Sequence, residues 1–212
     1  MKYIEKLETP QFFIDDTKEL NKWNEYRTKR ELKEFILENE QNYLCGYCEA
    51  KINLNNSHLE HIEPKSNDYS NLTFNYDNLI VSCQGNCESE DNKHHTCGHK
   101  KANEFSRDEF LNPTKQKYIR EYFIYENGFI KTSIKDSEKA IYTINLLQLN
   151  SENSNLIEAR KKALTEFRDR VKKNAIKNKK PIKEIAIILL NRENLAFISF
   201  LKFHFQKFTK DN

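Results

Sequence analysis

The residues of this 212-residue sequence that could do chemistry are concentrated in one window. All five cysteines and five of the six histidines lie between residues 45 and 99, and the sixth histidine is His204. Thiolates and imidazoles are the usual protein ligands of Zn²⁺, and in an intracellular chain clustered cysteines predict a metal site before disulfides. The window contains Cys45, Cys48, Cys83, Cys87 and Cys97 together with His58, His61, His94, His95 and His99.

The spacing of Cys45-Gly-Tyr-Cys48 is typical of one half of a zinc site. Two thiolates from one tight turn can bind the same tetrahedral ion. The other half must come from Cys83, Cys87 and Cys97. A redox pair or unpaired thiols would explain Cys45 and Cys48 alone, but three further cysteines downstream favour the metal site.

No stretch of the sequence suits a membrane span or a secretion signal. The longest uninterrupted apolar run covers residues 185–190, whereas a spanning helix needs about 20 such residues. Residues 1–10 lack the apolar core of a signal peptide. We therefore expect a soluble cytoplasmic protein that makes no membrane contact.

Hydrophobic spacing predicts a helix over residues 16–41 that ends just before Cys45. Thr28-Lys-Arg-Glu31 has the pattern of a capping box within it. Residues 45–104 are turn-rich, with short apolar pieces such as Leu79-Ile-Val81. These segments predict a helix followed by a small mixed core that contains the metal ligands.

The second half of the chain is predicted to be mainly helical. Asn127-Gly128, between two β-prone runs, is a strong signal for a hairpin, and Ser137 begins a helix that extends to Leu147. Pro181 suits the first turn of a final helical segment that extends to Phe208. The predicted fold is α+β, with an N-terminal helical segment (1–44), a metal-binding core (45–104) and a mainly helical region with a hairpin (105–212).

Several pieces of the sequence together resemble the HNH, or ββα-metal, endonucleases. More narrowly they resemble the PtuB family, the HNH effectors of Septu and retron-associated anti-phage systems. The resemblance covers roughly residues 1–160 and implies a zinc-stabilised ββα core. It rests on Met1-Lys-Tyr-Ile-Glu-Lys6, Cys45-Gly-Tyr-Cys-Glu49, Glu60-His-Ile-Glu-Pro-Lys65, Phe74-Asn-Tyr-Asp-Asn-Leu79, Ser82-Cys83, Cys97-Gly-His-Lys-Lys101, Asn127-Gly128, Ile144-Asn-Leu-Leu-Gln-Leu-Asn150 and Arg160.

The resemblance implies a role for each residue of the catalytic site. His61 would be the general base that activates water, and Glu60, where the family more often has Asp, would be a ligand of a catalytic Mg²⁺ or Mn²⁺ ion. Asn78 would orient the histidine by bonding across the loop, and His99 would be a second ligand of the ion. Because neighbouring strand residues point to opposite faces, Glu60 and His61 could both face one phosphate only from a bent or bulged strand end.

Other assignments within the window remain open at the level of sequence. Among the cysteines the resemblance favours Cys45, Cys48, Cys83 and Cys97 as zinc ligands, with an insertion between the last two and Cys87 as the spare. His94 and His95 are rivals of His99. His58 is expected to be a strand residue or a support for the ligands, and His204 a packing residue.

Positive charge is concentrated in the second half of the chain. Residues 1–104 carry 13 basic and 19 acidic side chains, a net charge of −6, whereas residues 105–212 carry 22 and 13, a net charge of +9. Residues 156–183 alone carry 11 basic and 3 acidic side chains. Such a stripe suits phosphate contacts, although a solvated or protein-docking surface has the same composition. The candidate nucleic-acid contacts are Lys100, Lys101, Arg168, Arg170, Lys172 and Lys173.

Taken with the resemblance, these features predict a metal-dependent endonuclease that cleaves DNA. The resemblance further implies a role in anti-phage defence together with a PtuA-like ATPase of the ABC/SMC type. Two other hypotheses remain: a non-catalytic zinc-stabilised module that binds nucleic acid or a partner, and an HNH effector that cleaves RNA.

Overall fold

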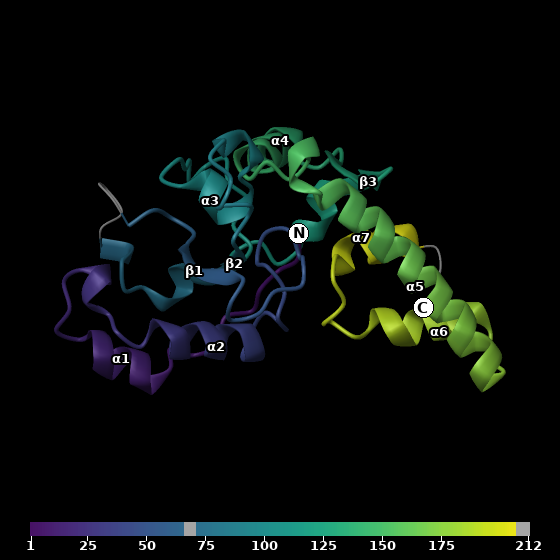
Figure 1. Cartoon of the computed structure of the whole chain (residues 1–212), viewed down its shortest axis with the longest axis horizontal. Coiled ribbons are helices and arrows are strands. Elements are labelled where there is room, and N and C mark those ends of the chain that lie inside the picture. Colours follow the sequence, from purple (N-terminus) through teal and green to yellow (C-terminus); the bar gives the residue numbers. More distant parts are fainter. Residues whose placement is uncertain (66–70, 207–212) are drawn as a thin grey trace.

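The structure is a computed structural model that describes residues 1–65 and 71–206. The fold is α+β, as predicted, with two small antiparallel sheets inside a helical frame (Figure 1). The strands are β1 (Ser57–His61), β2 (Leu79–Cys83), β3 (Phe123–Glu126) and β4 (Phe129–Thr132). The α-helices are α1 (Gln11–Thr17), α2 (Lys29–Asn39), α3 (Cys97–Lys101), α4 (Ser137–Leu146), α5 (Leu156–Asn178), α6 (Ile182–Leu190) and α7 (Ile198–His204).

The ligand window folds as two strands followed by a short helix. β1 pairs with β2 in a regular antiparallel register that runs from Ser57 opposite Cys83 to His61 opposite Leu79. The apolar residues of β2 are fully buried, because α2 and α3 both pack against this strand. Figure 1 shows the two helices on opposite sides of the ribbon. Two of the candidate ligands, Glu60 and Cys83, thereby lie on a strand pair that is covered from both sides.

The predicted hairpin is confirmed as β3 and β4. Asn127 and Gly128 form its turn, and both have positive φ angles (49° and 83°), as a tight hairpin turn requires. A side chain at position 128 would also collide with the backbone, because a Cβ there would lie 2.7 Å from the carbonyl oxygen of Ile157. Glycine at this position therefore lets the hairpin lie against the start of α5.

The predicted helix over residues 16–41 is wrong in its extent. The α-helix ends at Thr17 and the next begins at Lys29, with a single 3₁₀ turn at Trp23–Glu25 between them, because Tyr26 turns into the core against Phe13, with ring centroids 5.4 Å apart. The predicted capping box is absent. The hydroxyl of Thr28 donates to Asp16 rather than capping α2.

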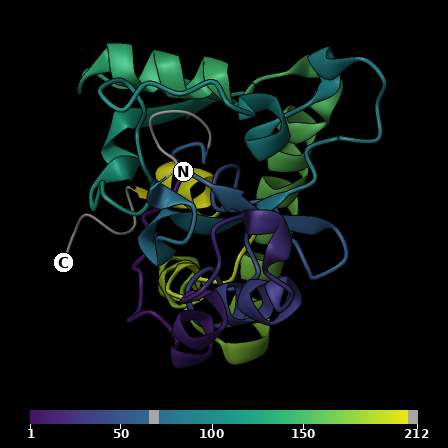
Figure 2. The same ribbon diagram turned by 90° about the vertical axis from the view of Figure 1, so that its left-hand side faces the viewer.

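The final helical segment is also interrupted, between α6 and α7. Its predicted end at Phe208 lies outside the described residues. α5, α6 and α7 pack against one another. In Figure 2, turned by 90°, α5 (light green) extends from the upper right of the view towards its bottom. None of the helices in the described ranges is long and apolar enough to cross a bilayer.

One hydrophobic cluster extends through all three predicted segments, from Ile4 through Leu79 to Phe200. The segment boundaries at residues 44/45 and 104/105 stay a prediction.

Candidate functional site

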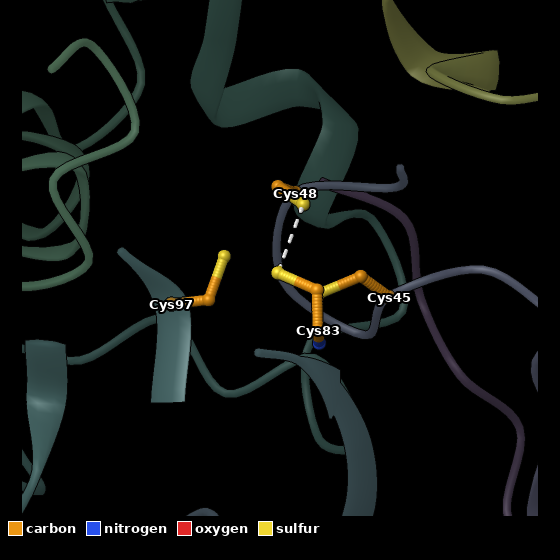
Figure 3. A group of neighbouring side chains, drawn as sticks. All are labelled: Cys45, Cys48, Cys83 and Cys97. Carbon is orange, nitrogen blue, oxygen red and sulfur yellow. Dashed lines mark hydrogen bonds between the residues drawn. The ribbon is translucent and has the colours of Figure 1, made fainter. Parts of the chain in front are cut away.

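Four cysteines converge from three separate parts of the chain. The sulfur atoms of Cys45, Cys48, Cys83 and Cys97 all lie within 4.8 Å of one another (Figure 3). The Sγ atoms of Cys48 and Cys83 are 3.9 Å apart. Two thiolates about 2.3 Å from one tetrahedral zinc ion are separated by about 3.8 Å, so the spacing fits Zn²⁺.

The electrostatics of the cluster also suit a cation. Burial opposes ionisation of Cys45, but hydrogen bonds from the neighbouring thiols outweigh it and lower the pKa of Cys45. The resulting thiolate raises the pKa of Cys97 above its usual value. One thiolate is therefore easy to form and the next is not, unless a divalent ion compensates the charge. In the described part of the chain this is the one group of three or more such ligands gathered this closely.

The sequence left the partner cysteines open, and the structure brings Cys83 and Cys97 to the cluster. Cys83 ends β2 and Cys97 begins α3, so the second half of the site comes from two elements rather than one turn. Cys87 is half-buried in the connection between them and lies outside the group.

The loop that carries the first two cysteines is anchored to distant parts of the chain. The carboxylate of Glu49 is buried, lies 3.0 Å from the Met1 ammonium group and accepts a 2.7 Å hydrogen bond from the backbone N–H of Ser199.

Arg160 is 2% exposed and donates to the carbonyl oxygens of Gly128 and Leu149. Arg160 therefore ties α5 to the hairpin instead of belonging to the exposed basic stripe of that helix.

Glu60 points into the space between β1 and α3. One carboxylate oxygen, Oε1, lies 3.1 Å from the Lys101 ammonium group and accepts from the hydroxyl of Tyr47. The other, Oε2, lies 3.4 Å from Nε2 of His58. Burial opposes ionisation of Glu60, but the hydrogen bond from His58 and the charge of Lys101 outweigh it, so the pKa of Glu60 falls below its usual value. The carboxylate is therefore held in its charged form beneath α3.

His61 faces the other side of the strand. Its ring packs edge-on against Trp23, with centroids 4.5 Å apart, and its Nε2 lies 2.9 Å from the carbonyl oxygen of Thr73. Burial lowers the pKa of His61 to about 4, so the ring is neutral at pH 7. Because β1 keeps a regular register to its end, no bulge brings Glu60 and His61 to one face. A phosphate could reach both only across the end of the strand.

Asn78 fastens the chain just after His61. Its side-chain carbonyl accepts from the backbone N–H of Glu63 at 2.8 Å, and its amide donates to the carbonyl of the same residue at 2.9 Å. The amide also reaches the carbonyl oxygen of Leu72 at 3.4 Å. Asn78 therefore bonds across the loop, whereas the contact to the His61 ring itself comes from Thr73.

The structure places His99 on the Glu60 side of the sheet, exposed on α3. Its ring lies 4.4 Å from the ring of His58, centroid to centroid, and 6.4 Å from that of His95. Of the two rivals, His95 contacts the carbonyl oxygen of Ser89 through Nε2. Among the described ring contacts, His99 is the one of the three histidines that is paired with a β1 residue.

One predicted nucleic-acid contact does not fit the structure. Lys101 is 1% exposed, and its ammonium group contacts Glu60 and the carbonyl oxygens of His61 and Ala102. A side chain that neutralises a buried carboxylate is not available to a phosphate. Lys100 is half-buried on the same short helix, and the four candidates on α5 are exposed: Arg168, Arg170, Lys172 and Lys173.

The sequence predicts His58 only as a strand residue or a support for the ligands, and it indicates no role for Gly98 or Trp23. His58 lies two residues before Glu60 on the same strand face, and the alternation of side chains along a strand was the available signal. A Cβ at position 98 would lie 2.6 Å from Oε2 of Glu60 and 2.8 Å from Nε2 of His58. Nothing in the sequence indicated that Trp23 would cover His61.

Comparison with known proteins identifies the window. Residues 45–93 match the HNH endonuclease family. This segment is therefore similar to HNH domains. It contains three of the four clustered cysteines together with Glu60, His61 and Asn78, and ends before Cys97 and His99.

The chain is also similar to a protein of Vibrio cholerae serotype O1 biovar El Tor named "Retron Vc95 putative HNH endonuclease". The two are 34% identical over 122 residues, which cover 55% of this chain and 56% of that protein. The matched part therefore spans just over half the length of the relative. Both comparisons agree with the HNH resemblance.

Proposed function

We propose that this protein is a metal-dependent HNH endonuclease that hydrolyses phosphodiester bonds of DNA. The observation that carries the proposal is the arrangement of the HNH domain itself. Glu60 and His61 end β1 on opposite faces of the strand, and His99 lies on α3 on the Glu60 side. Cys83 of β2 and Cys97 of α3 gather with Cys45 and Cys48. The two comparisons support a nuclease as the class of enzyme.

In this proposal His61 takes the proton of the attacking water. A carbonyl oxygen can only accept, so the contact with Thr73 assigns the ring proton to Nε2 and leaves Nδ1 with the free lone pair. Since the ring is neutral, Nδ1 can act as a base at pH 7. Lys101 and Asn78 hold the backbone on either side of the ring through bonds to His61 and Glu63. These contacts fix the direction in which Nδ1 points.

Glu60 and His99 are the residues that would hold the catalytic divalent ion. The fit is supported by Oε2 of Glu60, which lies next to Nε2 of His58 and faces the gap left by Gly98. Such an ion would stabilise charge on the phosphate and on the departing 3′ oxygen. The clustered thiolates would hold a second, structural Zn²⁺ that fixes α3, and with it His99, against β2.

The proposed setting is anti-phage defence in the manner of PtuB, with an ABC/SMC-type ATPase controlling the nuclease. The name of the Vibrio cholerae relative supports a link to retrons. The exposed basic residues of α5 would contact DNA or the ATPase.

The test is the cleavage of supercoiled plasmid DNA and of RNA by the purified protein with Mg²⁺ or Mn²⁺, alone and with a PtuA-like ATPase. Metal-dependent nicking or linearisation of DNA is the expected result. Cleavage of RNA alone would replace the substrate. Binding of nucleic acid or of the ATPase without cleavage of either substrate would refute the nuclease and favour the non-catalytic module.

A further inference from the structure

His58 contacts the same carboxylate oxygen that is left for the catalytic ion. Its Nε2 lies 3.4 Å from Oε2 of Glu60. Two donor atoms that are each about 2.1 Å from one ion lie about 3.0 Å apart at a right angle and about 3.4 Å apart at the tetrahedral angle. The observed separation is therefore that of two neighbouring ligands of one ion.

Gly98 leaves the space that such an ion would need. Any larger residue would place a Cβ within 3 Å of both Nε2 of His58 and Oε2 of Glu60. The glycine is in the first turn of α3, one residue before His99, so the gap opens directly beside the third donor.

The His58 ring is also incompletely satisfied by the protein. Its Nδ1 is buried and has no hydrogen-bond partner among the described residues. A buried polar atom without a partner is uncommon and frequently marks an ion or a water, strain or a functional group. The unpartnered Nδ1 lies on the opposite edge of the ring from the Nε2 that would bind the ion, so the case for His58 rests on the Nε2–Oε2 separation, the room beside Gly98 and the ring of His99 at 4.4 Å.

We propose that His58 joins Glu60 and His99 as a ligand of the divalent ion, in the gap beside Gly98. The donor atoms of His58, Glu60 and His99 do not yet lie within 4.8 Å of one another, because among the described residues only the four cysteines form such a group. The exposed His99 ring therefore has to turn towards His58 and Glu60 to bind the same ion. Exposed side chains change rotamer within picoseconds to nanoseconds, so the turn is easy.

This ligand set has a consequence for the metal. Imidazole nitrogen suits Mn²⁺, Zn²⁺ and later transition metals better than Mg²⁺, which prefers oxygen donors and keeps its water. Two imidazoles and one carboxylate therefore favour a transition-metal ion such as Mn²⁺ over Mg²⁺. The inference rests on the proposed function in one respect, namely that the ion bound by His58 is the ion that serves cleavage.

The experiment measures Mn²⁺ binding to the zinc-loaded protein without nucleic acid. The wild type is compared with His58→Gln and with His94→Gln, a matched control that replaces another half-buried histidine of the window. Free Mn²⁺ is followed by its electron paramagnetic resonance signal, and pulsed measurements detect the nitrogen atoms bound to the ion. Zinc content and the melting temperature verify that each variant is folded.

We expect His58→Gln to weaken Mn²⁺ binding by about 10- to 100-fold or more and to remove one of two nitrogen couplings, with a smaller loss for Mg²⁺. His94→Gln is expected to match the wild type. Unchanged Mn²⁺ affinity and nitrogen couplings in folded His58→Gln would overturn the inference, even if the protein cuts DNA. His58-dependent Mn²⁺ binding by a protein that cuts neither DNA nor RNA would sustain the inference and refute the proposed function instead.

Discussion

The replacement of Lys101 by Met decides between two roles for this lysine. A phosphate contact would be lost with little effect on folding. The structure instead shows an ammonium group that is 3.1 Å from Oε1 of Glu60 and 3.1 Å from the carbonyl oxygen of His61, with 1% of the side chain exposed. Met fills nearly the same volume, so the main change is the loss of a buried charge.

The magnitude follows from the partner that is left behind. Removing one member of a buried ion pair leaves an uncompensated charge and typically costs about 3–5 kcal/mol. For a chain of this length that corresponds to a fall in Tm of roughly 6–20 °C. The double variant Lys101→Met/Glu60→Gln removes both charges and is expected to recover a large part of the loss.

The assay is urea unfolding of the zinc-loaded protein without added divalent ion, combined with the salt dependence of DNA binding. We expect a large loss of stability in the single variant and a coupling energy of well over 1 kcal/mol in the double-mutant cycle. The reasoning is refuted if Lys101→Met unfolds like the wild type while the salt slope of binding decreases by about one unit, the signature of a lost phosphate contact.

Three further predictions concern the zinc site, the basic helix and the half-buried ion pairs of Glu193. Cys97→Ser is expected to lose zinc and to unfold residues 45–101, whereas Cys87→Ser should keep both the zinc and the fold. Equal zinc content of the two variants by elemental analysis would contradict this. Replacing Arg168, Arg170, Lys172 and Lys173 of α5 together by Gln should flatten the log–log salt slope of DNA binding by roughly two to four units, at about 0.9 per contact. An unchanged slope combined with loss of binding to the ATPase would make the helix a docking surface. Burial opposes ionisation of Glu193, but hydrogen bonds from Lys202 and Lys2 outweigh it and lower its pKa to about 2. The stability that this ionised group contributes is therefore present above pH 4.5 and lost as the pH falls towards 2, so Glu193→Gln should have a flatter Tm–pH curve over that range; parallel curves would contradict the assignment.

Much of the chemistry was predictable because it depends on local patterns. The Cys45-x-x-Cys48 spacing and the Asn127-Gly128 turn each specify a geometry within a few residues, and both occur as predicted in the structure. The choice of Cys97 over Cys87 was less secure, because it depends on how residues 84–96 fold back onto β2.

The incorrect expectations involve contacts between distant parts of the chain. Lys101, two residues after a histidine, has the appearance of a phosphate ligand in the sequence, but in the structure it pairs with the carboxylate of Glu60. The basic helix of residues 156–178 likewise gives no sign that Arg160 faces inward. The helix expected over residues 16–41 has continuous amphipathic spacing, yet it breaks where Tyr26 enters the core. Tertiary packing overrides local propensity in each case.

The central claim is that this HNH domain cleaves DNA with His61 as the base. The most direct measurement is the single-turnover cleavage rate of plasmid DNA by wild type and His61→Ala at saturating Mn²⁺. Because the ring is buried against Trp23, the variant will lose some stability, so zinc content and melting are measured alongside. The account predicts a rate lower by about 10²- to 10⁴-fold in a folded, zinc-loaded variant. Cleavage at nearly the wild-type rate by that variant would contradict it.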